Sequence, residues 1–221
     1  MMNMCKEYIK RFSLCILGLM LYALGCVLGV KAGAAGTNAW STLALGLGKV
    51  SGLSYGTATF SISILIILID FFGKGKLGFG TILNATLIPV FSDIYLALLS
   101  SIPDATGAVS GALLSLLGQT VIAFATIVYT IPALGAGPRD TLLVIVGKKF
   151  SKAPIGAVKL GLELAVLLIG VVLGAPLGLG TVLVLVLQAT IFQSVCKLCR
   201  YEMRSVKHED VLDTIKRVLG R

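Results

Sequence analysis

The sequence is poor in charged residues and contains a single histidine, and both shortages limit what the protein can be. Only 13% of its 221 residues are Asp, Glu, Lys or Arg, against about a quarter in soluble domains. Hydrophobic residues make up 57%, and the mean hydropathy is +0.98. A water-soluble domain is therefore excluded, and lipid has to be part of the solvent of this chain.

The shortage of histidine argues against the familiar enzyme classes. The letters GLSYG at 52–56 match a nucleophile elbow, but that motif needs a histidine base, and His208 lies in the C-terminal tail. Five cysteines are an odd number, and the CKLC pair at 196–199 has no second ligand pair for zinc. We therefore expect no catalytic residue, no metal site and no cofactor.

The formal net charge of +9 comes without any signature of nucleic-acid binding, so we expect no nucleic-acid partner. The basic residues instead flank six apolar runs of membrane-spanning length, at 12–32, 57–72, 81–102, 111–134, 156–173 and 181–196. With alternating loops, all of the 19 Lys and Arg except Lys31 and Lys49 lie on the side of the N-terminus. This predicts an all-α bundle of six spans in a bacterial cytoplasmic membrane, with both termini in the cytoplasm.

The two halves of the chain repeat each other at a spacing of about 100 residues. LGFGT at 77–81 recurs as LGLGT at 177–181, and GTNAWSTL at 36–43 falls opposite GAGPRDTL at 135–142. Each half holds three spans, an odd number, so the second half enters the membrane from the opposite side. We predict a 3+3 inverted-topology repeat; chance similarity between glycine-rich segments is the alternative.

The predicted organisation is a cytoplasmic N-terminus at 1–11, repeats at 12–103 and 104–196, and a basic tail at 197–221. Apolar residues recur in the tail at a helical period, which predicts an amphipathic cytoplasmic helix: Val211, Leu212, Ile215, Val218 and Leu219. The excess of basic residues is typical of a helix that binds anionic lipid, and the apolar stripe is typical of one that docks on a partner protein. The sequence does not separate these two roles.

Two short segments have the signals of helix starts. Pro138 stands at a first-turn position and Asp140 where the helix dipole favours an acid, in a run that ends near Gly147. Asn38 is a suitable N-cap for the counterpart in the first half. Such helices, entering from opposite faces, direct their positive ends at an anionic group. In the alternative, both lie flat in the interface, with Trp40 as an aromatic anchor and Arg139 paired with Asp140.

Polar residues inside the predicted spans form a second group of candidates. Asp93 falls near the middle of the third span, where an ionised carboxylate costs about 2.5–3.5 kcal/mol on insertion scales. Asn84 precedes it, and the repeat places Gln193 opposite Asp93, with Gln188 earlier on the same span. These side chains would line one midplane cavity. Alternatively, Asp93 lies nearer the outer end and contacts water or a helix end.

Two further acids have neighbouring lysines. Glu163 follows Lys159 by four residues, so the two share a helix face, either as a structural ion pair or as part of the cavity. Asp70 lies near the inner end of the second span, close to Lys74. We expect Asp70 to be interfacial.

Four motifs resemble the YczE/YyaS-type family of bacterial membrane proteins: NAWSTL at 38–43, GLSYGT at 52–57, GFGTILN at 78–84 and GPRD at 137–140. The resemblance covers roughly residues 18–193 and implies an integral membrane fold without assigning an activity. It also implies an asparagine-proline-tryptophan-aspartate-like turn in the first half. Ala39 and Ser41 replace the proline and the acid of that turn here, whereas the second turn is intact.

These observations favour a small-molecule secondary transporter, with an anionic substrate suggested by the helix starts. The rival is a membrane accessory or regulatory protein that binds a partner complex, and an intramembrane enzyme comes third. The candidate substrate-binding residues are Asn38, Trp40, Asn84, Asp93, Arg139, Asp140, Glu163, Gln188 and Gln193.

The topology can be tested with single cysteines in a background whose native cysteines are replaced by serine. Cysteines placed near Lys49, Ala105 and Pro176 should react with an impermeant thiol reagent added outside intact cells. Cysteines near Lys74 and Lys148 should react only after the cells are opened. Labelling near Lys74 from outside would contradict both the topology and the inverted repeat.

Overall fold

The computed structural model describes residues 2–202, 206 and 208–218, which are mostly helical. Leu219, assigned to the predicted apolar stripe of the tail, lies outside the described residues. The helices are α1 (Met2–Val30), α2 (Ala39–Ser51), α3 (Tyr55–Phe72), α4 (Phe79–Leu98), α5 (Ala108–Thr130), α6 (Pro138–Lys149), α7 (Ile155–Val172), α8 (Leu179–Leu198) and α9 (Val211–Val218), with a 3-10 turn η1 at Gly33–Ala35.

Six of these helices are long and apolar enough to cross a membrane, namely Lys6–Val30 within α1 and the whole of α3, α4, α5, α7 and α8. The prediction of six spans is confirmed, with boundaries that move by a few residues. The third span ends at Leu98 rather than at 102, because residues 99–107 leave the helix as turns and coil. The chain is a multi-pass α-helical membrane protein.

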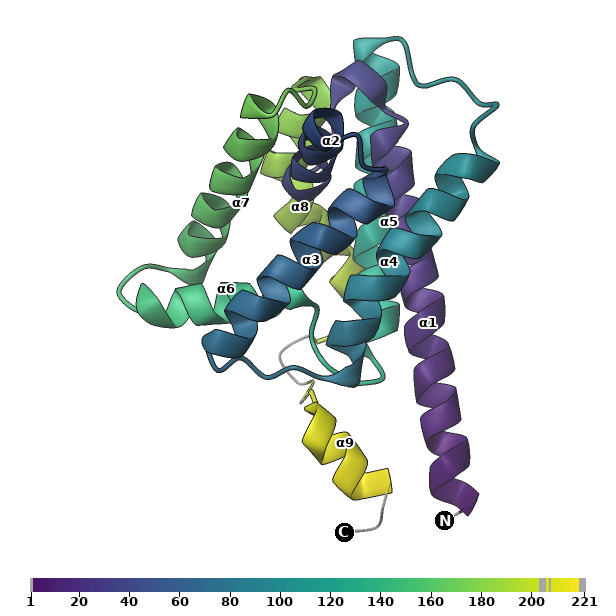
Figure 1. Cartoon of the computed structure of the whole chain (residues 1–221), viewed down its shortest axis with the longest axis vertical. Helices are drawn as coiled ribbons and strands as arrows, with labels where there is room; N and C mark the ends of the chain where they lie inside the picture. Colours follow the sequence, from purple (N-terminus) through teal and green to yellow (C-terminus); the bar gives the residue numbers. More distant parts are fainter. Residues whose placement is uncertain (1, 203–205, 207, 219–221) are drawn as a thin grey trace.

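The other two helices of the bundle are too short to cross. α2 has 13 residues and α6 has 12, so each is about 20 Å long against a hydrocarbon core of about 30 Å. Their predicted starts are confirmed: the Asn38 side chain accepts a hydrogen bond from the Ser41 N–H at 3.0 Å, and Pro138 is the first residue of α6. Figure 1 shows α2 near one end of the bundle and α6 near the other.

α1 and α5 pack against each other along much of their length. Gly25 and Gly118 allow this contact, because a Cβ added at Gly118 would lie 2.6 Å from the Gly25 carbonyl oxygen. The reverse distance, from a Cβ at Gly25 to the Gly118 carbonyl oxygen, would be 2.7 Å. The predicted close packing at Gly25 is therefore present, and any side chain there would push the two backbones apart.

The two copies of the glycine motif make equivalent contacts. A Cβ at Gly78 would collide with the Leu134 carbonyl oxygen, and a Cβ at Gly178 would collide with the carbonyl oxygens of Ala34 and Ala35. Leu134 lies shortly before α6, and Ala34 and Ala35 lie shortly before α2. Each motif therefore packs against the turn that leads into the short helix of the other half.

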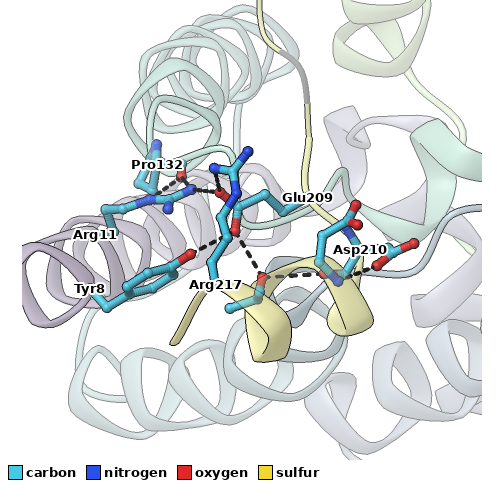
Figure 2. Close-up of polar contacts among 8 residues, drawn as sticks. Tyr8, Arg11, Pro132, Glu209, Asp210 and Arg217 are labelled. Carbon is cyan, nitrogen blue, oxygen red and sulfur yellow. Dashed lines mark hydrogen bonds and ion pairs between the residues drawn. The ribbon is translucent and has the colours of Figure 1, made fainter. Parts of the chain in front are cut away.

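The tail folds back onto the bundle and does so through Glu209 (Figure 2). The Glu209 carboxylate is 6% exposed and accepts hydrogen bonds from Arg11 Nη2 at 2.9 Å, Tyr8 Oη at 3.1 Å, Thr214 Oγ1 at 3.0 Å and Arg217 Nη1 at 2.7 Å. Arg11 also donates twice to the Pro132 carbonyl. These contacts join α1, α9 and the turn after α5, so that α9 lies at the same end of the bundle as the N-terminal part of α1 (Figure 1).

Backbone hydrogen bonds complete the docking of the tail. The Glu209 N–H donates to the Ala133 carbonyl at 2.8 Å, and the Val211 N–H donates to the Leu77 carbonyl at 3.1 Å. The tail thereby bridges a turn of the first half and a turn of the second. On α9, Thr214 faces the bundle while Leu212 and Ile215 stay exposed.

Loss of the Glu209 charge should release the tail. Burial raises the pKa of Glu209, but the hydrogen bonds from Arg11 and Thr214 outweigh it and hold the pKa of this carboxyl below its ordinary value. Its contribution to docking is therefore present above the ordinary pKa and is lost as the pH falls through the lowered one. At neutral pH, Glu209→Gln should speed hydrogen exchange of the Val211 amide about tenfold or more, since charged hydrogen bonds are worth about 1.5–3 kcal/mol.

The matched control is Glu7→Gln, which removes an exposed acid at the same end of the bundle. It should leave the exchange of the Val211 amide unchanged. Equal exchange in wild type and Glu209→Gln would show that Glu209 does not hold the tail.

Candidate functional site

A cavity of about 290 Å³ lies between the helices, close to the lower limit of about 300 Å³ for typical small-molecule sites. Its walls come from every helix from α1 to α8. All the predicted site residues except Asp93 and Gln193 line it: Asn38, Trp40, Asn84, Arg139, Asp140, Glu163 and Gln188. The structure thus brings together residues that are up to 150 positions apart in the chain.

The two short helices meet at this cavity through Trp40 and Arg139. The guanidinium carbon of Arg139 lies 4.8 Å from the centre of the Trp40 ring, a cation–π contact. Arg139 makes no ion pair and no side-chain hydrogen bond with any residue in the described part of the chain. In the alternative, Arg139 pairs with Asp140; the structure has no ion pair between them, although Arg139 acts on Asp140 electrostatically.

The start of α6 presents further polar groups. No side chain caps this helix, Pro138 carries no N–H, and the Asp140 N–H donates to the Gly137 carbonyl at 3.1 Å, so the Arg139 N–H is the free backbone donor of the first turn. Asp140 accepts a hydrogen bond from Tyr129 Oη at 3.3 Å. The Asn84 amide lies near Gly137, 3.4 Å from the position of an added Cβ. The Asp140 carboxylate lies at the same helix start, 3.3 Å from the position of an added Gly137 Cβ. The Arg139 N–H and guanidinium together provide the donors for an anion beside it.

On the opposite wall, Glu163 is already engaged. Its carboxylate is 3.8 Å from Lys159 Nζ and accepts a hydrogen bond from the Gln188 amide. The ion pair expected from the spacing is present, and it lines the cavity as well. Lys159 is thus paired with Glu163, whereas Arg139 makes no ion pair with any described residue and interacts with the cavity acid Asp140 only electrostatically.

Several lining residues were absent from the sequence-based candidates: Tyr22, Thr59, Ser63, Gln119, Thr126, Tyr129 and Lys159. Gln119 lies in the middle of α5, and an amide in a lipid-embedded run is a signal that would have identified it. Tyr22 and Tyr129, whose rings contact each other edge to face, carry no such signal. Aromatic residues are common in spans, so only the three-dimensional packing assigns them to the cavity.

The prediction of Asp93 as a midplane cavity residue is wrong. Asp93 lies near the end of α4 and accepts hydrogen bonds from Ser54 Oγ at 2.5 Å and from the Gly56 N–H at 2.7 Å. Both donors lie at the start of α3, where the helix dipole favours a negative charge. The alternative, an acid that contacts a helix end, is the correct one.

The expectation for Gln193 is also wrong. Gln193, expected opposite Asp93, is exposed on the outer side of α8, because the rotation of that helix turns Gln188 rather than Gln193 toward the cavity. Asp70 lies near the end of α3, as expected, and is 0% exposed within the bundle. Its two carboxylate oxygens have no hydrogen-bond partner among the described residues.

The arrangement defines a class: a polytopic membrane protein whose two short helices begin at a polar cavity between six spans. A sequence comparison gives the family. Residues 9–197 match the family of unknown function DUF6198, and the chain belongs to that family. It is 30% identical to the uncharacterized membrane protein YczE of Bacillus subtilis, over 86% of this chain and 87% of that one. It is 34% identical to an uncharacterized protein of Haemophilus influenzae, over 79% of this chain and 78% of that one.

The resemblance drawn from the motifs is thus confirmed. No solved structure matches this chain.

The role of Asp93 as a helix cap can be measured. Asp93→Ala removes two hydrogen bonds to the start of α3 and should lower the free energy of unfolding by about 1–3 kcal/mol. Because Asp93 does not line the cavity, the fluorescence of Trp40, the only tryptophan, should not change. The control is Asp104→Ala, which removes an exposed partner of Lys31 and should cost about 0–1 kcal/mol. Wild-type stability in Asp93→Ala would contradict the capping role.

Proposed function

We propose that this protein is a secondary transporter, rather than an enzyme, that carries a small anionic molecule through the cavity. The observation that carries the proposal concerns Arg139: its guanidinium lines a cavity inside the bundle and makes no ion pair and no hydrogen bond with any described residue, and the nearby Asp140 acts on it only electrostatically. A charge without a partner in a low-dielectric interior is costly, and such charges are retained where a ligand uses them. A small anion would receive hydrogen bonds from the planar fork of Arg139 and from the backbone N–H of Arg139 at the start of α6.

An inverted repeat would give this cavity access from both sides of the membrane. Three features support the repeat. The packing of α4 on α1 in the first half corresponds to the packing of α8 on α5 in the second half. Across the halves, the packing of α6 on α3 corresponds to the packing of α2 on α7. The glycines Gly78 and Gly178 make the same contact across the two halves. The two short helices lie near opposite ends of the bundle (Figure 1). Alternating access by rocking of the two halves follows naturally from such symmetry.

We further propose that the end carrying both termini faces the cytoplasm, because nearly all the basic residues lie there. The two lysines at the other end are engaged locally. Lys31 pairs with Asp104 at 3.0 Å, and Lys49 donates to the Gly174 carbonyl at 2.9 Å. These two lysines therefore do not change the orientation that the other basic residues predict.

The accessory-protein alternative receives less support. The tail, which would be the natural contact for a partner complex, is held by Glu209 on the bundle of the same chain (Figure 2). The polar groups, by contrast, converge on the cavity. We therefore place the function in the cavity.

Trp40 provides a direct test of anion binding, because it is the only tryptophan and lies against Arg139. Purified protein is titrated with inorganic phosphate, lactate and methanesulfonate while the tryptophan emission is recorded. At least one of these anions should give a saturable change. Arg139→Ala should weaken that binding about tenfold to a hundredfold, and Arg139→Lys should restore only part of it, because lysine lacks the planar fork.

The control for this titration is Lys148→Ala, which removes one positive charge from the exposed end of α6. It should bind the anion as the wild type does. Unchanged affinity in Arg139→Ala would exclude Arg139 as the anion ligand. No response to any of the three anions in wild type would argue against an anionic substrate.

A further inference from the structure

One face of α3 leads from the cavity to a buried acid. Thr59, Ser63, Ile66 and Asp70 follow one another at spacings of four, three and four residues, so they form a single stripe along the helix. Thr59 and Ser63 line the cavity. Asp70 lies at the other end of this stripe, completely buried and with both carboxylate oxygens unpartnered among the described residues.

The short helix α6 covers this end of the stripe. In the turn after α3, a Cβ at Gly73 would lie 2.9 Å from Ile145, and a Cβ at Gly75 would lie 2.6 Å from Thr141. Ile66 belongs to the same apolar cluster as Leu142 of α6. Asp70 is therefore buried where α3 packs against α6, the helix whose first turn carries Arg139.

No charged group compensates Asp70. The titratable and charged side chains on the elements packed against α3 are Lys49 of α2, Asp93 and Tyr95 of α4, Arg139, Asp140, Lys148 and Lys149 of α6, and Lys74 and Lys76 in the following turn. Among the described residues, none of these hydrogen-bonds to Asp70 or acts on it electrostatically. An ionised carboxylate would cost several kcal/mol in this position. The packed arrangement of α3 and α6 therefore requires the neutral carboxylic acid.

We propose that Asp70 is a proton-binding site that couples the packing of α6 on α3 to protonation, and so couples the proposed transporter to protons. When α3 and α6 are packed, an O–H bond on one carboxylate oxygen holds a proton taken from water. When α6 moves away, water reaches Asp70, the O–H bond breaks, the proton passes to water and the carboxylate is hydrated. This inference rests on the proposed function for its link to transport, whereas the proton site itself does not.

Asp93 cannot take this role, because its oxygens already accept hydrogen bonds from Ser54 and Gly56. Movement of α6 would reach the substrate site directly, since Arg139 lies on its first turn and contacts Trp40. Protonation of Asp70 and the position of Arg139 are thus linked through one short helix.

The first test detects the proton without any ligand. Infrared difference spectra of the purified full chain, labelled with ¹³C-aspartate, are recorded between about pH 5 and about pH 9. Wild type and Asp93→Asn should show the carbonyl stretch of a protonated aspartic acid that is lost at high pH. Asp70→Asn should lack this band, and in Asp70→Glu the band should lose its isotope shift. A band unchanged in Asp70→Asn would overturn the proposal.

The second test follows α6 through Trp40, again without ligand. The emission of Trp40 should change with pH in wild type and in the Asp93→Asn control, because deprotonation of Asp70 shifts α6. Asp70→Asn, which mimics the neutral acid, should remove that change; Asp70→Leu serves if the amide variant unfolds. A pH response identical to wild type in a folded Asp70 variant would overturn the coupling. A response that follows replacement of sodium by choline instead of pH would overturn the assignment to protons.

These outcomes are separable from those of the proposed function. Normal anion titration of Trp40 together with an unchanged pH response in Asp70→Asn would overturn the proton site alone. Absence of any anion response would overturn the proposed function while leaving the Asp70 band to be judged by itself.

Discussion

Two helices that are too short to cross the membrane determine how the rest of this protein is built. α2 and α6 begin inside the bundle, so their first N–H groups need polar partners in a region that supplies no bulk water. Asn38 satisfies this need in α2, whereas α6 begins with Pro138 and has no side-chain cap. The polar side chains of the surrounding spans gather at these two helix starts, and the cavity is the result.

The glycines and the tail hold the surrounding frame in place. Direct backbone contact at Gly25 and Gly118 brings α1 and α5 together, and Gly78 and Gly178 fit against the turns that lead into the short helices. At one end only, the tail adds the Glu209 contacts across a turn of each half. A rocking motion of the halves would therefore have to release the Glu209 contacts at this end.

The sequence was sufficient wherever the signal was local. The spans follow from apolar runs, and Asn38, Arg139 and Asp140 follow from the N-cap and proline signals of helix starts. The sequence was insufficient where a residue's place depends on its depth in the membrane or on the rotation of its helix about its axis. For Asp93, an apolar run does not define where its helix meets the start of another helix, so the sequence predicts the wrong depth. For Gln193, the repeat predicts the position along α8 but not the direction in which each side chain points.

The central claim is that the cavity is reached from both sides of the membrane. It is tested most directly by one cysteine at Gln119, in the middle of α5 and on the cavity wall, in a chain whose native cysteines are replaced by serine. The cysteine is reacted with a small impermeant thiol reagent in right-side-out and in inverted membrane vesicles. The account predicts labelling in both preparations. Labelling from one side only, or from neither, would contradict it.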